Sequence, residues 1–175
     1  MTTYRIVKTK WAASAFDGEG ARRDGGRWNS VGTPMVYTAE SRSLAALEVL
    51  VNLEGPARGY SIVRCSFPDT LVVTIGRSNL PPDWQQSPAP PALAALGDAW
   101  VARASSVVLA VPSAVIPEEV NHLLNPTHPD FDKVTIYPPE PHVYDERLVA
   151  RTERSRRRAS SKARKRRLGG TDTGT

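Results

Sequence analysis

The stretch 25–54 constrains the fold more than any other part of the chain, because loop, strand and helix signals follow one another within it. Its glycines and its proline mark a loop, since these residues favour backbone geometries that others resist. Residues 35–38 (Met-Val-Tyr-Thr) are strand formers and predict a short β-strand. Ser41 or Ser43 can then cap a helix that runs to about Leu53.

Glu48 is the unusual residue of this predicted helix. The apolar stripe of the helix begins at Leu44 and repeats at i+3 and i+7, and Glu48 is the i+4 neighbour of Leu44 at the margin of the stripe. A carboxylate at that margin is costly to desolvate unless another group pairs with it. Glu48 is therefore a candidate functional group. The alternative is that it borders solvent or forms a structural salt bridge with Arg27 or Arg42.

The rest of the chain alternates short apolar runs with turn signals. The pattern predicts a second helix over residues 92–104, and strands at 4–7, 60–67, 71–75, 106–111, 133–137 and 142–144. It predicts loops at 17–24, 78–91 and 116–130, the last with one helical turn at 118–123. Many short strands with two clear helices indicate an α+β fold rather than a doubly wound parallel sheet.

The charge of the chain is unevenly distributed. Of the 175 residues, 151–167 include ten Lys or Arg and one acid, whereas residues 1–150 include 13 basic and 16 acidic residues. The net charge of +5 therefore comes from the C-terminal end, while the preceding part is mildly acidic. We expect one folded domain at 1–149 and a basic, disordered tail at 150–175.

Several classes of protein are disfavoured by the sequence. No apolar run is long enough for a membrane span and no signal peptide is evident, so a cytoplasmic protein is expected. The single cysteine, Cys65, cannot form an internal disulfide, and its place on a predicted strand beside Val63 and Phe67 indicates a buried, inert thiol. The three histidines lack the spacing of metal ligands, so no metal site is expected.

A set of ordered motifs resembles the RES-domain family, the toxins of RES–Xre type II toxin–antitoxin systems. The similarity runs from about Tyr4 to Tyr144. Its motifs are Gly25-x-Arg27-Trp28-Asn29, Gly32, Tyr37 ten positions after Arg27, Ala45-x-x-Glu48, Val111-Pro112-Ser113, Asn121-x-Leu123-Leu124-Asn125-Pro126 and His128-Pro129-Asp130-Phe131. The resemblance implies an ADP-ribosyltransferase-like fold, in which short, mostly antiparallel strands form a split sheet flanked by helices.

The resemblance also implies an activity and a site. The expected reaction is cleavage of NAD⁺ at the nicotinamide–ribose bond by a glycohydrolase or phosphorylase, which would deplete NAD and arrest growth. NAD⁺ is then the substrate, and no cofactor is expected. Glu48 and Arg27 are the catalytic candidates; Arg27, Tyr37, Ser113 and Asn121 are the candidates for NAD⁺ binding. Ser113 could instead only end a strand, and Asn121 could only tie a loop to backbone.

Two other functions stay open from the sequence. One is a mono-ADP-ribosyltransferase that modifies a cellular protein, and the other is a basic nucleic-acid-binding protein in which Glu48 only supports the fold. A Ser-His-Asp hydrolase built from Ser113, His122 or His128, and Asp130 is disfavoured, because nothing around Ser113 resembles a nucleophile elbow. The family further implies a homodimer and an Xre-like helix-turn-helix antitoxin that blocks the active site, with DNA contacted only through the antitoxin complex.

Overall fold

The structure is a computed structural model that describes residues 1–53 and 56–148. Its helices are α1 (Glu19–Asp24), α2 (Arg42–Val51) and α3 (Pro91–Arg103), with 3-10 turns η1 (Thr9–Ser14), η2 (Asp69–Leu71), η3 (Arg77–Asn79) and η4 (Phe131–Lys133). Its strands are β1 (Thr2–Lys8), β2 (Val36–Ala39), β3 (Tyr60–Ser66), β4 (Val72–Thr74), β5 (Val108–Pro112), β6 (Val120–Leu124), β7 (Thr135–Ile136) and β8 (Glu140–His142). The tail predicted at 150–175 lies outside the described residues.

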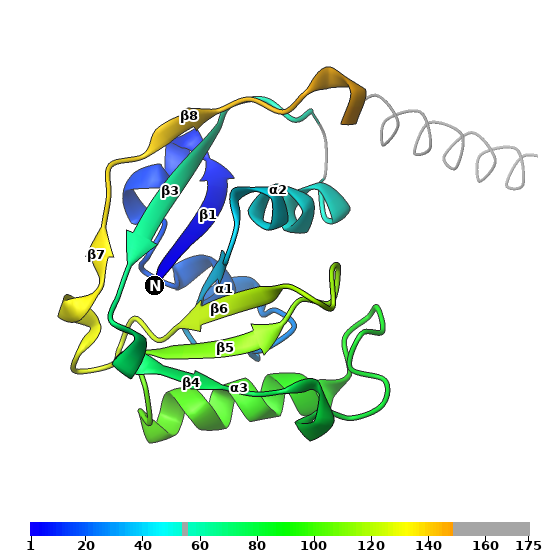
Figure 1. Ribbon diagram of the computed structural model, residues 1–175, viewed down its shortest axis with the longest axis vertical. Helices are drawn as coiled ribbons and strands as arrows, with labels where there is room; N and C mark the ends of the chain where they lie inside the picture. Colours follow the sequence, from blue (N-terminus) through cyan, green and yellow to red (C-terminus); the bar gives the residue numbers. More distant parts are fainter. Residues whose placement is uncertain (54–55, 149–175) are drawn as a thin grey trace, which may run out of the picture.

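The strands form one curled sheet that is nearly divided between β1 and β2 (Figure 1). The strand order is β4-β5-β6-β2-β1-β3-β7, with β8 pairing beside β7 on β3. All strand pairs are antiparallel except β4 with β5. β1 pairs with β3 along its whole length but with β2 only where Tyr4 faces Ala39. The α+β class and the split, mostly antiparallel sheet are therefore as predicted.

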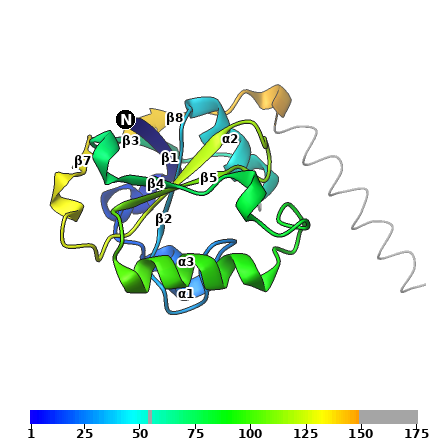
Figure 2. The same cartoon turned by 60° about the horizontal axis from the view of Figure 1, so that its bottom comes forward.

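Each half of the sheet packs against its own helix. Leu44 and Ala45 of α2 are buried in a cluster with Ile6 of β1 and Ile62 of β3. The α3 helix lies along the other half of the sheet, as Figure 2 shows. It buries Leu93 and Trp100 in a different cluster, together with residues of β5, of β6 and of the loop before β2: Leu109, Val111, Leu123, Trp28 and Met35. The two helices thus leave the junction of the halves between them.

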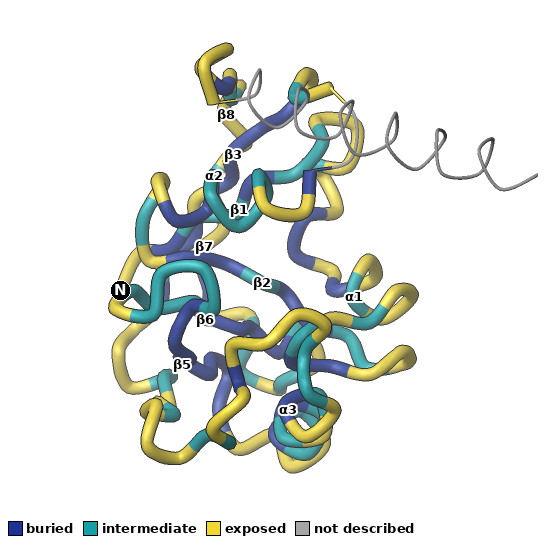
Figure 3. The backbone as a smooth tube through the Cα atoms, turned by 90° about the vertical axis from the view of Figure 1, so that its right-hand side faces the viewer, coloured by how far each residue is buried: buried dark blue, intermediate teal, exposed yellow. Residues whose placement is uncertain are grey.

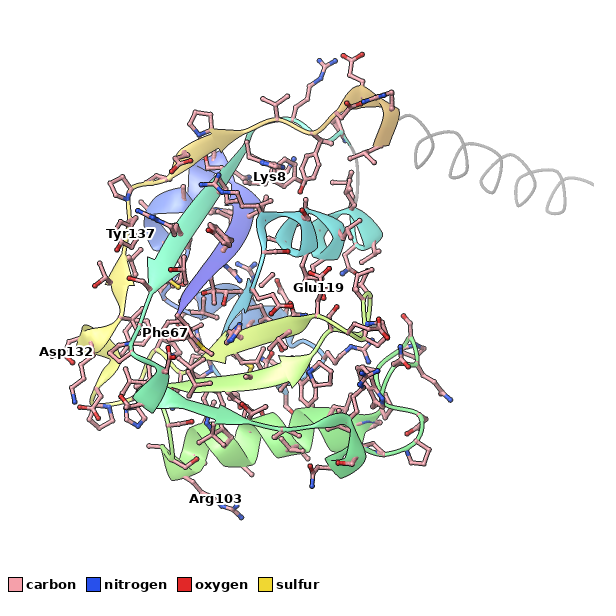
Figure 4. All side chains as sticks on the ribbon, in the orientation of Figure 1. Lys8, Phe67, Arg103, Glu119, Asp132 and Tyr137 are labelled. Carbon is pink, nitrogen blue, oxygen red and sulfur yellow. The ribbon has the colours of Figure 1, made fainter. Side chains whose placement is uncertain are left out.

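The two predicted helices begin where local chemistry places them. Ser41 caps α2, because its Oγ accepts a hydrogen bond from the backbone N–H of Leu44 (3.0 Å). Its hydroxyl donates in turn to Oε2 of Glu119 (3.1 Å), which Figure 4 labels near the start of α2. Pro91 occupies the first turn of α3, as predicted, where its missing N–H costs no helical bond.

Two predicted loops are wrong in part. Residues 17–24 include helix α1, which lacks apolar periodicity and begins after Gly18 in a left-handed conformation (φ 76°). Residues 116–130 include strand β6 and not the predicted helical turn, because β6 pairs with β5 on one side and with β2 on the other. These partners are distant in the sequence, so the local pattern does not contain them. Figure 3 shows how deeply β5 and β6 are buried.

The fold also places two single residues that the sequence singled out, Pro112 and Cys65. Pro112, expected to end the strand before it, is the last residue of β5 and faces Val120 of β6. Cys65 is fully buried, as predicted, and burial raises the pKa of its thiol to about 11. Among the described helices, none is both long and apolar enough to cross a membrane. The same residues contain no group of three or more His, Cys, Asp or Glu side chains placed to hold a metal ion.

Candidate active site

Glu48 lies on α2, and one of its carboxylate oxygens is hydrogen-bonded by side chains from the half of the sheet that contains β5 and β6. Its Oε1 accepts hydrogen bonds from the hydroxyl of Ser113 (2.8 Å) and from the side-chain amide of Asn121 (2.5 Å). The Ser113 Oγ already accepts from the backbone N–H groups of Val115 (3.0 Å) and Ile116 (3.1 Å), so its single proton is directed to Glu48. Ser113 is fully buried at the end of β5, and Asn121 lies on β6. Three predicted site residues therefore form one hydrogen-bonded unit.

The other carboxylate oxygen of Glu48 is available. Within residues 1–53 and 56–148, Oε2 has no hydrogen-bond partner and Glu48 forms no salt bridge. Arg42, one of the alternative partners from the sequence, pairs instead with Glu140 (3.3 Å). A half-buried carboxylate that uses only one of its oxygens for structural bonds is suited to act on a ligand.

A cavity of about 200 Å³ opens beside Glu48 at the division of the sheet. It is lined by Tyr4, Arg5, Ile6, Tyr37, Thr38, Ala39, Ala45, Glu48, Val49 and Asn121. These residues come from β1, β2, α2 and β6, so the near-division of the sheet, with a helix over one side, creates the hollow.

Tyr37 is among the residues that line this cavity, but its hydroxyl is engaged elsewhere. The hydroxyl donates to Oδ1 of Asn29 (2.7 Å) and accepts from the backbone N–H of Trp28 (3.0 Å). Burial raises the pKa of the Tyr37 phenol, so the group is neutral at physiological pH. The phenol of Tyr37 is therefore not available as a base.

Arg27 lies outside the lining of the cavity, in the loop that precedes β2. Its guanidinium donates to the backbone carbonyls of Trp84 (2.6 Å) and Gln86 (3.0 Å). Desolvation lowers the pKa of Arg27, while the nearby carboxylate of Glu48 and the phenol of Tyr37 act in the opposite direction. The salt bridge with Glu48 that the sequence left open as an alternative is absent from the ion pairs of the described residues, and Arg27 is held by the two carbonyls instead.

The loop that carries Arg27 is locked by close contacts. The buried Asn29 amide donates to the carbonyls of Ala21 (2.8 Å), Ser30 (3.1 Å) and Thr33 (3.0 Å). A side chain on Gly97 of α3 would place its Cβ 1.8 Å from the carbonyl oxygen of Trp28. Trp28 itself is buried in the core, in agreement with a packing role. The position of Arg27 and Tyr37 is therefore determined by packing as well as by hydrogen bonds.

Arg5 is a site residue that sequence reasoning missed. It lies in β1 and lines the cavity with Glu48, and its Nη1 donates to the backbone carbonyl of Tyr37 (2.8 Å) across the division of the sheet. Its Nε is buried without a hydrogen-bond partner in the described chain. Burial lowers the pKa of Arg5, and the nearby Asp17 partly offsets that effect. The available signal was an arginine in the middle of an otherwise apolar strand, Tyr4-Arg5-Ile6-Val7.

The Ser-His-Asp arrangement is ruled out by geometry. The Ser113 hydroxyl is committed to Glu48, whereas His128 bonds the backbone of Ala104 (3.0 Å). His122 is buried beside Phe67, with ring centroids 5.9 Å apart. Asp130 pairs with Lys133. The backbone N–H of Asp130 donates to Nδ1 of His128 (3.0 Å), but Ser113 has no hydrogen bond with either histidine in the described chain.

Comparison with known proteins agrees with this architecture. A sequence model of the RES domain matches residues 2–147. A protein named Toxin Res from Photorhabdus laumondii subsp. laumondii is 36% identical over 135 residues, covering 76% of this chain and 86% of the relative. A Prs ADP-ribosylating toxin from Sphingobium sp. is 37% identical over 147 residues, covering 79% of this chain and 89% of the relative.

A solved structure shows the same fold. The crystal structure of the M. tuberculosis MbcT–MbcA toxin–antitoxin complex matches with a TM-score of 0.65 at 22% identity, covering 79% of this chain and 82% of the other. The family match spans most of the residues that build the sheet and the cavity. The chain belongs to the RES domain family, whose curated relatives include toxins.

Proposed function

We propose that the protein is the toxin of a toxin–antitoxin pair and that it cleaves NAD⁺ between nicotinamide and ribose. The observation that carries the proposal is Glu48, a carboxylate with one oxygen anchored by Ser113 and Asn121 and the other available beside a cavity. The names of the similar toxins support the biological role, and the ADP-ribosylating relative supports NAD⁺ as the substrate.

The reaction requires negative charge near the ribose. As the bond between C1′ and nicotinamide breaks, its electron pair leaves with the nicotinamide, and the ribose develops oxocarbenium character. Nicotinamide departs as a neutral molecule, so no strong general acid is needed. The free oxygen of Glu48 would accept from a ribose hydroxyl and stabilise the developing cation. Tyr37 would pack its ring on the nicotinamide, and the guanidinium groups of Arg27 and Arg5 suit the phosphates.

The hydrogen bonds favour a revised assignment for two residues. We expected Ser113 and Asn121 to bind NAD⁺ directly, but both donate to Oε1 of Glu48. We therefore assign them as positioning residues that fix the carboxylate before substrate arrives. A preorganised charge is more effective than one that must reorient during the reaction.

The acceptor of ADP-ribose defines the second candidate function. Water or phosphate would make the enzyme a glycohydrolase or phosphorylase, and a protein side chain would make it a mono-ADP-ribosyltransferase. The name of the Sphingobium relative favours the transferase as the alternative. The nucleic-acid reading gains no support, because residues 1–150 carry more acidic than basic residues.

We also propose the partners that the family resemblance implies. The MbcT–MbcA complex is an assembly of a toxin with an antitoxin, which supports an antitoxin partner here. An Xre-like helix-turn-helix antitoxin that covers the cavity beside Glu48 would block the reaction, and DNA would be reached through that complex. A homodimeric toxin is part of the same proposal, as is action in the cytoplasm.

Release of nicotinamide from NAD⁺ by the purified protein tests the reaction, with and without added phosphate. Glu48→Gln removes the charge but keeps an oxygen for Ser113 and Asn121, so the fold is preserved while nicotinamide release falls by about 100-fold or more. Glu118→Gln is the matched control, since Glu118 is an exposed carboxylate whose ion pair is a 3.6 Å contact with Arg77. A Glu48→Gln variant as active as the control would overturn the mechanism.

A further inference from the structure

The cavity beside Glu48 is too small for a whole dinucleotide. Its volume is about 200 Å³, whereas sites for drug-sized ligands commonly occupy about 300–1,000 Å³. If NAD⁺ is the substrate, as proposed above, this cavity receives the nicotinamide–ribose half. The adenosine half must then lie against another part of the protein surface.

A second cavity shares one lining residue with the first. Its volume is about 340 Å³, and it lies between η1 and α1, with Trp11, Asp17 and Arg23 among its lining residues. Arg5 lines both cavities. Arg5 is therefore common to the two linings, and the combined volume of the two cavities is within the range of ligand sites.

Arg5 at this junction has the properties of an anion-binding group. Within the described residues it forms no salt bridge, and its one hydrogen bond is the contact of Nη1 with the carbonyl of Tyr37. Its Nε is buried and unpartnered. A guanidinium offers a planar set of donors that matches phosphate oxygens, so a diphosphate at this point would meet a positive charge that no salt bridge within the described residues engages.

The far side of the second cavity offers a surface for a nucleobase. Trp11 is 51% exposed, and the ammonium of Lys10 lies 4.3 Å from its ring centroid. A base stacked on an aromatic side chain contributes about 1–3 kcal/mol of binding. The exposed indole, with a cation beside it, is therefore a suitable platform for the base of a nucleotide.

Asp17 is the acid of this cavity that remains available for hydroxyl groups. Two other acids on the rim are engaged, Glu19 by Arg22 and Asp24 by Arg23. Asp17 accepts the backbone N–H of Glu19 through Oδ1 (2.8 Å), and its Oδ2 has no hydrogen-bond partner in the described chain. Carboxylates recognise ribose hydroxyls in other dinucleotide sites.

We infer that the cavity between η1 and α1 binds the adenosine monophosphate half of NAD⁺, with the diphosphate lying across Arg5 and the base against Trp11. The inference rests on the proposed function for its physiological ligand. The binding of adenosine monophosphate itself does not depend on turnover and can be measured separately.

Calorimetric titration of the full-length protein with adenosine monophosphate is the direct test. The wild type binds the nucleotide, and Trp11→Ala weakens binding by at least about tenfold, the equivalent of a stacking contribution near 1.4 kcal/mol. Tyr137→Ala is the matched control, since Tyr137 stacks on Arg64 (3.8 Å) and lines neither cavity. Absence of binding by the wild type, or equal binding by Trp11→Ala, would overturn the inference.

A kinetic comparison separates this inference from the proposed function. Nicotinamide mononucleotide lacks the adenosine half, so Trp11→Ala raises KM for NAD⁺ by about tenfold and leaves release from the mononucleotide unchanged. Equal losses with both substrates would contradict the assignment of the second cavity. If the wild type binds adenosine monophosphate through Trp11 but releases no nicotinamide, the proposed reaction fails and the nucleotide site stands.

Discussion

The carboxylate of Glu48 and the loop that carries Arg27 are held in place by different kinds of interaction. Glu48 lies on a regular, capped helix, and two side-chain donors hold its carboxylate. The loop has little regular structure and is held by one buried amide, Asn29, and by the backbone of Trp28 packed against α3. The charge at Glu48 can therefore be altered at small cost to the fold, whereas a change in the loop affects function and stability together.

Gly97→Ala should have the largest effect, because it acts on the loop through the backbone. An added Cβ would lie 1.8 Å from the Trp28 carbonyl oxygen, which is backbone and cannot rotate away. We expect the free energy of unfolding to fall by about 3 kcal/mol, at the upper end of overpacking effects. Urea denaturation measures this loss.

The control for this variant is Gly20→Ala in α1. Nothing lies within 4 Å of a Cβ at Gly20, so alanine there should leave stability unchanged or raise it by about 0.5–1 kcal/mol. If Gly97→Ala were as stable as Gly20→Ala, the loop would not depend on its contact with α3, and the contrast with Glu48 would lose its basis.

Features fixed by local signals could be predicted from the sequence, whereas those fixed by distant contacts could not. Helix α2 and the position of Glu48 on it were predicted, because the apolar stripe and the Ser41 cap are local signals. The partners of Arg27, the carbonyls of Trp84 and Gln86, lie 57 and 59 residues further along the chain. No local pattern specifies such contacts. Strand β6 was missed for the same reason, since its hydrogen bonds go to strands that are distant in sequence.

Arg5 shows how far the sequence alone can predict the residues of the site. Its strand was predicted from the apolar residues around it, but its importance depends on the gap between β1 and β2. The gap results from how the two halves of the sheet curl apart, which is a property of the whole fold. An arginine within an apolar strand is therefore a useful signal, but it gains meaning only when the neighbouring strand is known.

Asn29→Ala should give the next largest effect, on stability and activity together. It removes the acceptor of the Tyr37 hydroxyl and the donor to three backbone carbonyls, all in a part-buried setting. We expect a loss of about 2 kcal/mol in unfolding free energy and about a tenfold drop in kcat/KM for NAD⁺. Denaturation and a nicotinamide-release assay measure the two quantities.

Tyr37→Phe shows whether Asn29 acts through Tyr37. The variant keeps the ring but removes the hydroxyl, so a positioning role predicts that the losses in kcat/KM from Asn29→Ala and Tyr37→Phe do not add in the double variant. Additive losses would mean that Asn29 supports the loop independently of the tyrosine, and the network of Asn29, Trp28 and Tyr37 would be only structural.

Asn121→Ala should have the smallest effect on the fold and still reduce activity, unlike the variants of the loop that carries Arg27, which lower stability as well. Asn121 donates to Oε1 of Glu48, so its loss frees the carboxylate to move without exposing the core. We expect kcat to fall about tenfold with KM unchanged, and stability to change by less than about 1 kcal/mol. Loss of a residue that binds NAD⁺ directly would instead raise KM, and that result would restore our first assignment.

Asn52→Ala is the matched control, because the Asn52 amide donates to the backbone carbonyl of Glu48 (3.1 Å) and does not touch its carboxylate. Its kcat should equal that of the wild type, since Ser41 caps the start of α2, the helix is packed without the Asn52 side chain, and the backbone N–H of residue 52 that caps its end is kept in the variant.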